Sequence, residues 1–303
     1  MSTRQNLNSR RKKISLLARG NLEWYIMLAP TIIVLLVITI YPLVYSLIIS
    51  FQSLHLQKPN LPIRFIGLSN FISVVRYDAF LKSVTNTLLL ALSSVSIGCL
   101  IGLGVALLLY RIGAGNIVLV LLVIPMTVTP VVSALVWRFM YHPQLGIINY
   151  TLRMIGISGI TWLAKPLSAF ISIVLVDVWQ WTPFIIFILL AGLVSLPSEP
   201  FESVQLDGAS SFQIFRYLTL PMLKKHIGVA ILFRAIGVMK LFDTIYVLTQ
   251  GGPGRATQTL SIYTYKLGFQ YFALGEAAAL SYLTLILLIV VALIIIRQFK
   301  LFW

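Results

Sequence analysis

The sequence predicts an all-α membrane protein with six transmembrane helices. Hydrophobic residues make up 59% of the 303 positions and charged residues 10%, whereas soluble domains carry about 25% charged residues. Six apolar stretches are long enough to cross a bilayer, which takes roughly 20 residues. Helices are expected because backbone groups inside lipid must bond to each other. The predicted spans are Trp24–Phe51, Ser83–Tyr110, Asn116–Trp137, Leu167–Leu196, Leu223–Leu248 and Gly275–Arg297.

The formal charge of +15 is unevenly placed along the chain. Basic residues gather in a polar tail, residues 1–20, which precedes the six-span domain of residues 21–303. Six spans place both termini on one side, together with the loop 197–221, and the positive-inside rule makes that side cytoplasmic. The excess charge therefore sets the topology, and nucleic acid is not an expected partner.

Small residues and prolines give the second and third spans their predicted features. Gly98 and Gly102 form a small-xxx-small pair, which lets another helix approach closely. Pro125 and Pro130 lie in the third span. The one cysteine, Cys99, lies in the second span and excludes both a disulfide framework and a cysteine metal cluster.

The longest polar interruption of the C-terminal half is Glu199–Pro221. Acidic residues in its first turn and a glycine at Gly208 predict a short helix that ends in a left-handed residue. Ser210 or Ser211 is expected to cap a second short helix, which Pro221 ends. Apolar side chains on a compact helix pair in water predict a docking surface. The alternative is an elbow lying on the membrane surface.

Ionisable residues inside spans are functional candidates because burying charge in lipid is costly. In the fourth span, Asp177, Trp181 and Phe184 share one face, with Gln180 beside them. A face of the fifth span contains Arg234, Gly237, Val238 and Leu241. The two faces either pair across the bundle or line a polar path for a hydrophilic solute.

Lys240 and Asp243 lie three positions apart in the predicted fifth span, where they can form an ion pair. A structural pair is the favoured interpretation. A competing hypothesis makes Asp177, Lys240 and Asp243 the relay of an ion-coupled secondary carrier, and a third makes the chain a membrane scaffold. No phosphate-binding loop, metal motif or nucleophile elbow is present, so we do not expect an enzyme.

Two motifs carry a family resemblance. The run from Glu202 to Ala209, continued by Phe215 and Leu220-Pro221, resembles the signature cytoplasmic loop of ABC-importer permeases, although Ser203-Val204 replaces the usual Ala-Ala. The runs 177–183 and 242–253 are similar to the carbohydrate-uptake branch, the binding-protein-dependent sugar permeases of the maltose, lactose and glycerol-phosphate type. The matching core covers residues 82–297.

The resemblance implies the permease subunit of a type I importer in a bacterial inner membrane, with both termini cytoplasmic. It implies partners: a second, distinct permease, two ATPase subunits that hold ATP and Mg²⁺, and an extracytoplasmic solute-binding protein. The residues implied to couple to the ATPase are Glu202, Ser203, Asp207, Gly208, Ala209, Phe215 and Pro221.

The resemblance also assigns a sugar path and a docking turn. The path would contain Asp177, Gln180, Trp181, Phe184, Arg234, Gly237, Val238 and Leu241. An acidic sugar that meets Arg234 is one hypothesis for the substrate. The turn with Gly251, Gly252 and Pro253 would lie where the binding protein docks, although a tight turn needs those glycines for its backbone angles anyway.

Overall fold

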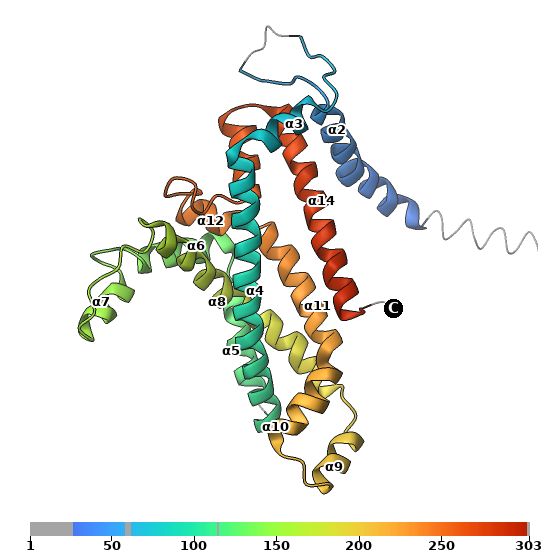
Figure 1. The fold of residues 1–303 in the computed structure, drawn as a ribbon, viewed down its shortest axis with the longest axis vertical. Coiled ribbons are helices and arrows are strands. Elements are labelled where there is room, and N and C mark those ends of the chain that lie inside the picture. The colour runs from blue at the N-terminus through green and yellow to red at the C-terminus, as the bar shows by residue number, and fades with distance from the viewer. Residues whose placement is uncertain (1–26, 58–61, 114, 302–303) are drawn as a thin grey trace, which may run out of the picture.

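The computed structural model describes residues 27–57, 62–113 and 115–301, and the basic tail of residues 1–20 lies outside them. These residues form a bundle of helices along one long axis (Figure 1). The elements are η1 (Leu36–Ile40), α2 (Tyr41–Ser50), α3 (Ser69–Arg76), α4 (Asp78–Ile112), α5 (Asn116–Thr127), α6 (Pro130–Met140), α7 (Ile147–Met154), α8 (Pro166–Val194), α9 (Glu199–Leu206), α10 (Ser211–Ile214), η2 (Phe215–Thr219), α11 (Leu220–Met239), α12 (Asp243–Leu248), α13 (Leu260–Tyr265), η3 (Lys266–Gln270) and α14 (Leu274–Phe299).

Four helices in the described part of the chain are long and apolar enough to cross a membrane: Met27–Ser50, α4, α8 and α14. They correspond to the predicted first, second, fourth and sixth spans. The all-helical fold is as predicted, but six unbroken spans are not found. The third and fifth predicted spans are each divided in two.

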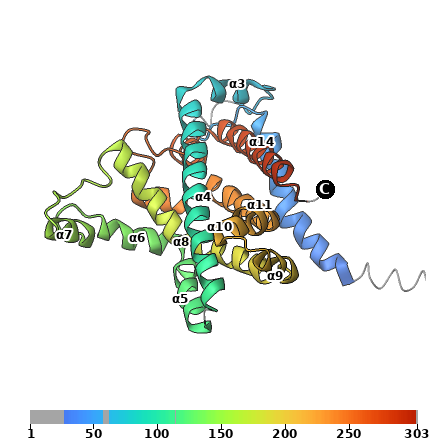
Figure 2. The same cartoon turned by 60° about the horizontal axis from the view of Figure 1, so that its bottom comes forward.

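The third predicted span is broken between α5 and α6, whose axes differ by 89°. Thr129 has an extended backbone (φ −61°, ψ 142°) because it precedes Pro130, which disfavours helical geometry at the residue before it. The 12 residues of α5 are about 18 Å long, shorter than a hydrocarbon core of about 30 Å. In both views α6 and α7 lie on one side of α4, and α2 and α14 lie on the other (Figures 1 and 2).

The fifth predicted span ends early, because α11 stops at Met239 and α12 begins at Asp243. Lys240 follows the last residue of α11, and its backbone is not helical (φ −95°, ψ 2°). The helical spacing that predicted a Lys240–Asp243 pair is therefore absent. That predicted ion pair does not form: among the described residues, the one ion pair within 4.0 Å joins Asp177 and Arg234.

The expected end of a helix at Pro221 is also wrong. Helical backbone runs without a break from Ser211 through η2 into α11. The Leu220 amide donates to the Phe215 carbonyl, a wide π-helical bond directly before the proline. A π turn tolerates the missing proline N–H and the bulk of its ring, which would disrupt a regular α-helical turn. One continuous rod therefore connects the end of the 197–221 loop to the centre of the bundle.

The core of the bundle depends on close contact between α4 and α8. A Cβ atom built on Gly102 would lie 2.8 Å from Cγ2 of Ile185, and one built on Gly98 would lie 3.0 Å from Cδ1 of the same residue. The small-xxx-small pair thus allows the approach expected of it, with Ile185 from α8 seated against both glycines.

This contact predicts a difference between two glycines of α4. Gly102→Val is expected to destabilise the purified protein by about 1–3 kcal/mol, because the added methyl groups overpack the α4–α8 contact. The matched control is Gly104→Val, since no atom of another element among the described residues lies within 4 Å of a Cβ at position 104. Thermal unfolding in detergent measures both, and equal melting shifts would contradict the prediction.

Candidate functional site

A buried ion pair lies at the centre of the bundle. Nη2 of Arg234, on α11, donates to Oδ2 of Asp177, on α8, at 2.6 Å. Asp177 is 2% exposed and Arg234 is 5% exposed. The second carboxylate oxygen, Oδ1, is buried and accepts no hydrogen bond from any described residue. The guanidinium carbon of Arg234 lies 5.3 Å from the centroid of the Trp181 ring, within the range of a cation–π contact.

The pair lines a cavity of about 310 Å³ between α6, α8, α11 and the start of α12. The predicted path residues that line this cavity are Asp177, Trp181, Phe184, Arg234, Gly237 and Leu241. The other two predicted residues have different roles: Nε2 of Gln180 donates to the Val128 carbonyl at 2.8 Å, and Val238 belongs to the buried apolar core. Gln180 thus ties α8 to the break between α5 and α6.

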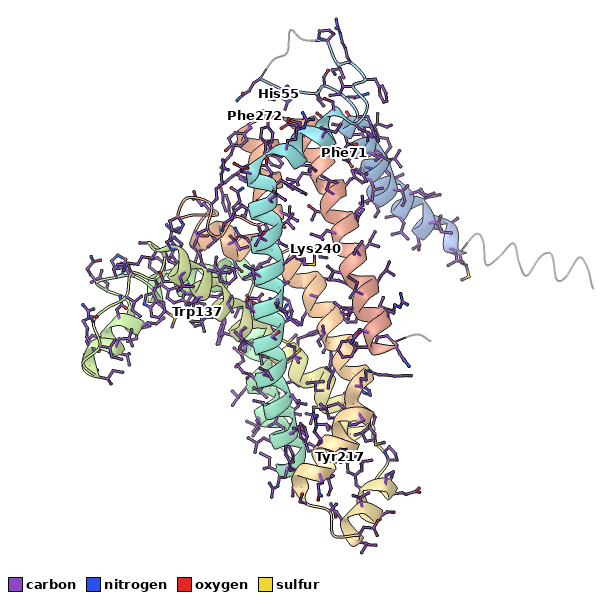
Figure 3. The ribbon with its side chains drawn as sticks, viewed as in Figure 1. His55, Phe71, Trp137, Tyr217, Lys240 and Phe272 are labelled. Carbon is purple, nitrogen blue, oxygen red and sulfur yellow. The ribbon has the colours of Figure 1, made fainter. Side chains whose placement is uncertain are left out.

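Further cavity residues were not among the predicted path residues: Pro130, Phe233, Lys240, Phe242 and Asp243. Pro130 and Phe242 reach the cavity because two predicted spans are broken, so a pattern of unbroken helices could not reveal them. Phe233 precedes Arg234 and meets Phe184 edge to face, with ring centroids 6.3 Å apart. Lys240 lies at mid-height of the bundle, well inside both ends (Figure 3).

The cavity therefore combines balanced charge with aromatic walls. It has two basic side chains, Arg234 and Lys240, and two acidic ones, Asp177 and Asp243. Asp177 and Arg234 are paired, and the free oxygen of Asp177 needs a donor, because a buried unsatisfied acceptor costs about 1–3 kcal/mol. A ligand with hydroxyl groups and one apolar face fits this combination.

A second surface lies at the opposite end of the molecule from α3 (Figure 1). Gly208 separates α9 from α10 in left-handed geometry (φ +78°), as predicted. Ser210 and Gln213 form a reciprocal capping box at the start of α10. Large apolar side chains stand out from this end: Leu206 is 89% exposed, and Phe212 and Tyr217 are also exposed. Figure 3 places Tyr217 at this end of the molecule.

The residues predicted to couple to an ATPase are spread over this surface. Glu202, Ser203, Asp207, Gly208 and Pro221 are exposed, whereas Ala209 and Phe215 are partly buried. Leu206, Phe212 and Tyr217 were not among the predicted coupling residues. The sequence signal that could have identified them is the presence of large apolar side chains within a polar stretch.

The turn after α12 is held by a small hydrogen-bond network. The hydroxyl of Thr257 bonds with that of Thr249 and donates to the Gly252 carbonyl, each at 2.7 Å. Gly251 has a left-handed backbone (φ +89°), and its Cβ position lies 3.1 Å from Ile262. Backbone geometry thus accounts for Gly251, while Gly252 and Pro253 remain partly exposed.

Helices that are long and apolar enough to span a membrane, packed around a cavity with an ion pair and aromatic rings, indicate an integral membrane protein. The chain belongs to the family described as the binding-protein-dependent transport system inner membrane component, whose model matches residues 94–301. The protein is thus an integral inner-membrane permease subunit of an ABC importer. Nothing in these similarities supports the ion-coupled secondary carrier.

Named relatives cover most of the chain. A trehalose/maltose transport system permease protein of Thermococcus litoralis is 38% identical over 270 residues, covering 88% of this chain and 89% of the relative. A sulfoquinovosyl glycerol transport system permease protein of Agrobacterium fabrum is 34% identical, covering 84% and 83%. A bacterial alginate ABC transporter, crystallised with an alginate-bound periplasmic protein, shares the fold with a TM-score of 0.79 at 23% identity, covering 92% of this chain and 94% of that one.

Proposed function

We propose that this permease forms the translocation path for an uncharged sugar or oligosaccharide. The cavity that holds the Asp177–Arg234 pair beside Trp181 and Phe184 carries the proposal. An aromatic ring stacks on the apolar face of a pyranose, and polar groups fix its hydroxyls. The relative named for trehalose and maltose transport supports a neutral sugar, and the relative named for sulfoquinovosyl glycerol, a sulfonated sugar, supports a sugar substrate in general.

The charges favour a neutral sugar over an acidic one. An acidic substrate would favour a cavity with a net positive charge, but the guanidinium of Arg234 is paired with Asp177 at 2.6 Å. Lys240 and Asp243 line the same cavity without pairing, so the four charged side chains of its lining sum to zero. The free Oδ1 of Asp177 can accept a hydrogen bond from a sugar hydroxyl, and the remaining Arg234 N–H groups can donate to a neighbouring one.

Coupling to ATP hydrolysis is proposed to act through α9. In this proposal α9 seats on one of two separate ATPase subunits, on the cytoplasmic side that also holds both termini. The exposed Leu206, Phe212 and Tyr217 supply apolar contacts, and Glu202 and Asp207 supply charge. The unbroken rod from Ser211 to Met239 would carry a displacement of this surface to the cavity, because Arg234 lies on the same rod.

The remaining assignments concern partners outside the cytoplasm and in the membrane. We assign the turn at Gly252 and Pro253 to the extracytoplasmic binding protein, since it is partly exposed and fixed by Thr257. A second, distinct permease completes the path, because the described helices surround the cavity only in part. Residues 1–20 form a cytoplasmic tail in this arrangement.

The experiment is uptake into proteoliposomes that contain the purified importer with its ATPase subunits, with binding protein outside. The probes are radiolabelled trehalose, maltose and a glucuronate-containing disaccharide. We expect uptake of a neutral disaccharide that requires ATP and is insensitive to a protonophore. Uptake driven by an ion gradient without ATP, or confined to the acidic probe, would refute the proposal.

A further inference from the structure

Four aromatic rings form a continuous series that starts at the cavity. Phe242 stacks on Tyr246 with ring centroids 5.2 Å apart, and both contact Tyr265, at 5.2 and 5.1 Å. Tyr265 stacks on Phe269 at 5.4 Å. The rings come from the start of α12, from α13 and from η3, segments that the turn with Gly251–Pro253 separates in sequence. We refer to Phe242, Tyr246, Tyr265 and Phe269 as the aromatic ladder.

The aromatic ladder connects the cavity to the surface. Phe242 lines the cavity of the Asp177–Arg234 pair and also a second cavity of about 420 Å³, whose lining includes Tyr265 and Phe269. Phe242, Tyr246 and Tyr265 are partly exposed, and Phe269 is 70% exposed. Figure 3 places Lys240, beside the inner end of the ladder, at mid-height, and Phe272, just beyond its outer end, near α3.

Hydroxyl groups accompany the rings along the second cavity. Its remaining lining residues are Ser261, Thr264, Ser281 and Thr284. Ser281 and Thr284 donate to carbonyls of their own helix, Ala277 and Leu280, so each hydroxyl oxygen keeps lone pairs that can accept from a ligand. The phenols of Tyr246 and Tyr265 bond to each other at 3.3 Å. Rings and acceptors without charge suit a neutral, hydroxylated ring.

The ladder differs from the apolar core beside it because its rings lie next to a cavity that also contains hydroxyl groups. The buried core residues around α12 and α13, such as Ile245 and Ile262, are fully enclosed. Phe242, Tyr265 and Phe269 of the ladder instead line the second cavity. Aromatic faces exposed beside hydroxyl groups are the chemistry that binds sugars.

We propose that the aromatic ladder is a second sugar-binding site, on which a pyranose stacks as it moves between the α3 end and the central cavity. This inference rests on the proposed function and extends it. Since Phe242 borders both cavities, one ring of a disaccharide can occupy the central cavity while the other stacks on Tyr265 or Phe269.

The test measures sugar uptake by the complete importer. The sugar is trehalose or maltose, whichever the wild-type importer takes up. The variants are Phe269→Leu alone and Tyr265→Leu with Phe269→Leu. Ring-retaining variants, Tyr265→Phe and Phe269→Trp, are measured beside them. The matched control is Tyr41→Leu with Tyr45→Leu, since these exposed rings also stack, at 6.1 Å, but lie in the first span. Melting temperatures show that each variant is folded.

The leucine variants are expected to lower sugar uptake about 3- to 10-fold per ring removed, from the strength of aromatic contacts. The ring-retaining variants and the first-span control should stay near wild type. Leucine variants that transport normally, or ring-retaining variants that fail equally, would overturn the ladder proposal but leave the proposed function intact. A wild-type importer that takes up neither sugar would overturn both. Phe269→Leu keeps the test decisive if the double variant unfolds, because its ring is mostly exposed.

Discussion

Arg234→Met alone is expected to destabilise the permease by about 3–5 kcal/mol, because it leaves the carboxylate of Asp177 buried without a counter-charge. Asp177→Asn is expected to have a similar effect through the unpaired guanidinium. The measurement is the yield and melting temperature of the purified protein in detergent. These losses would be among the largest for single substitutions in this chain.

The double variant Asp177→Asn with Arg234→Met separates stability from transport. Removing both charges abolishes the unpaired ion, so we expect most of the lost stability to return. Sugar uptake should not return, since the guanidinium donors are gone and the amide introduced at position 177 is an uncharged, weaker acceptor than the carboxylate. If the loss of stability in the double variant equals the sum of the losses in the two single variants, the two residues do not act as a pair. If it transports normally, the pair is structural and does not bind sugar.

Leu206→Asp is expected to leave the permease folded and to abolish its association with the ATPase subunits. The side chain is 89% exposed, so the folded chain alone loses little when it is replaced. A central apolar contact in an interface is worth about 2 kcal/mol or more, which corresponds to a loss of roughly 30-fold or more in affinity. Co-purification with the ATPase subunits and sugar-stimulated ATP hydrolysis measure the effect.

The control for this variant is Leu145→Asp, at a leucine that is 85% exposed in the connection between α6 and α7. It should keep the ATPase subunits bound. Equal loss in both variants would indicate a general effect of the introduced charge. If Leu206→Asp still bound the ATPase subunits and still supported sugar-stimulated ATP hydrolysis, the assignment of α9 to the ATPase interface would be wrong.

Much of the fold follows from local sequence. The length and hydropathy of α4, α8 and α14 predicted their spans, because a helix in lipid bonds its own backbone and needs no partner to exist. Gly98 and Gly102 indicated a close contact before Ile185 could be identified as the residue in it. Gly208 indicated the left-handed end of α9.

Helical spacing predicted part of the lining of the central cavity, whereas the role of these residues in a sugar path stays a prediction. Helical spacing placed Asp177, Trp181 and Phe184 on one face and Arg234 and Gly237 on another, and the structure brings the two faces to one cavity. Spacing also placed Gln180 and Val238 beside them. The side chain of Gln180 instead donates to the Val128 carbonyl, and the side chain of Val238 packs in the apolar core. The elements that pack beside a helix decide which of its side chains border a cavity.

The sequence by itself determined an all-helical membrane permease, its family, and the charged residues inside its spans. The tertiary structure alone decided where the third and fifth spans break, why Lys240 and Asp243 face a cavity without pairing, and how Phe242 meets Tyr265. Hydrophobicity and periodicity act within one segment, whereas a helix break or a contact between distant segments depends on packing against the rest of the chain. The aromatic ladder could therefore not be predicted from the sequence, because it depends on the packing of α12 against α13.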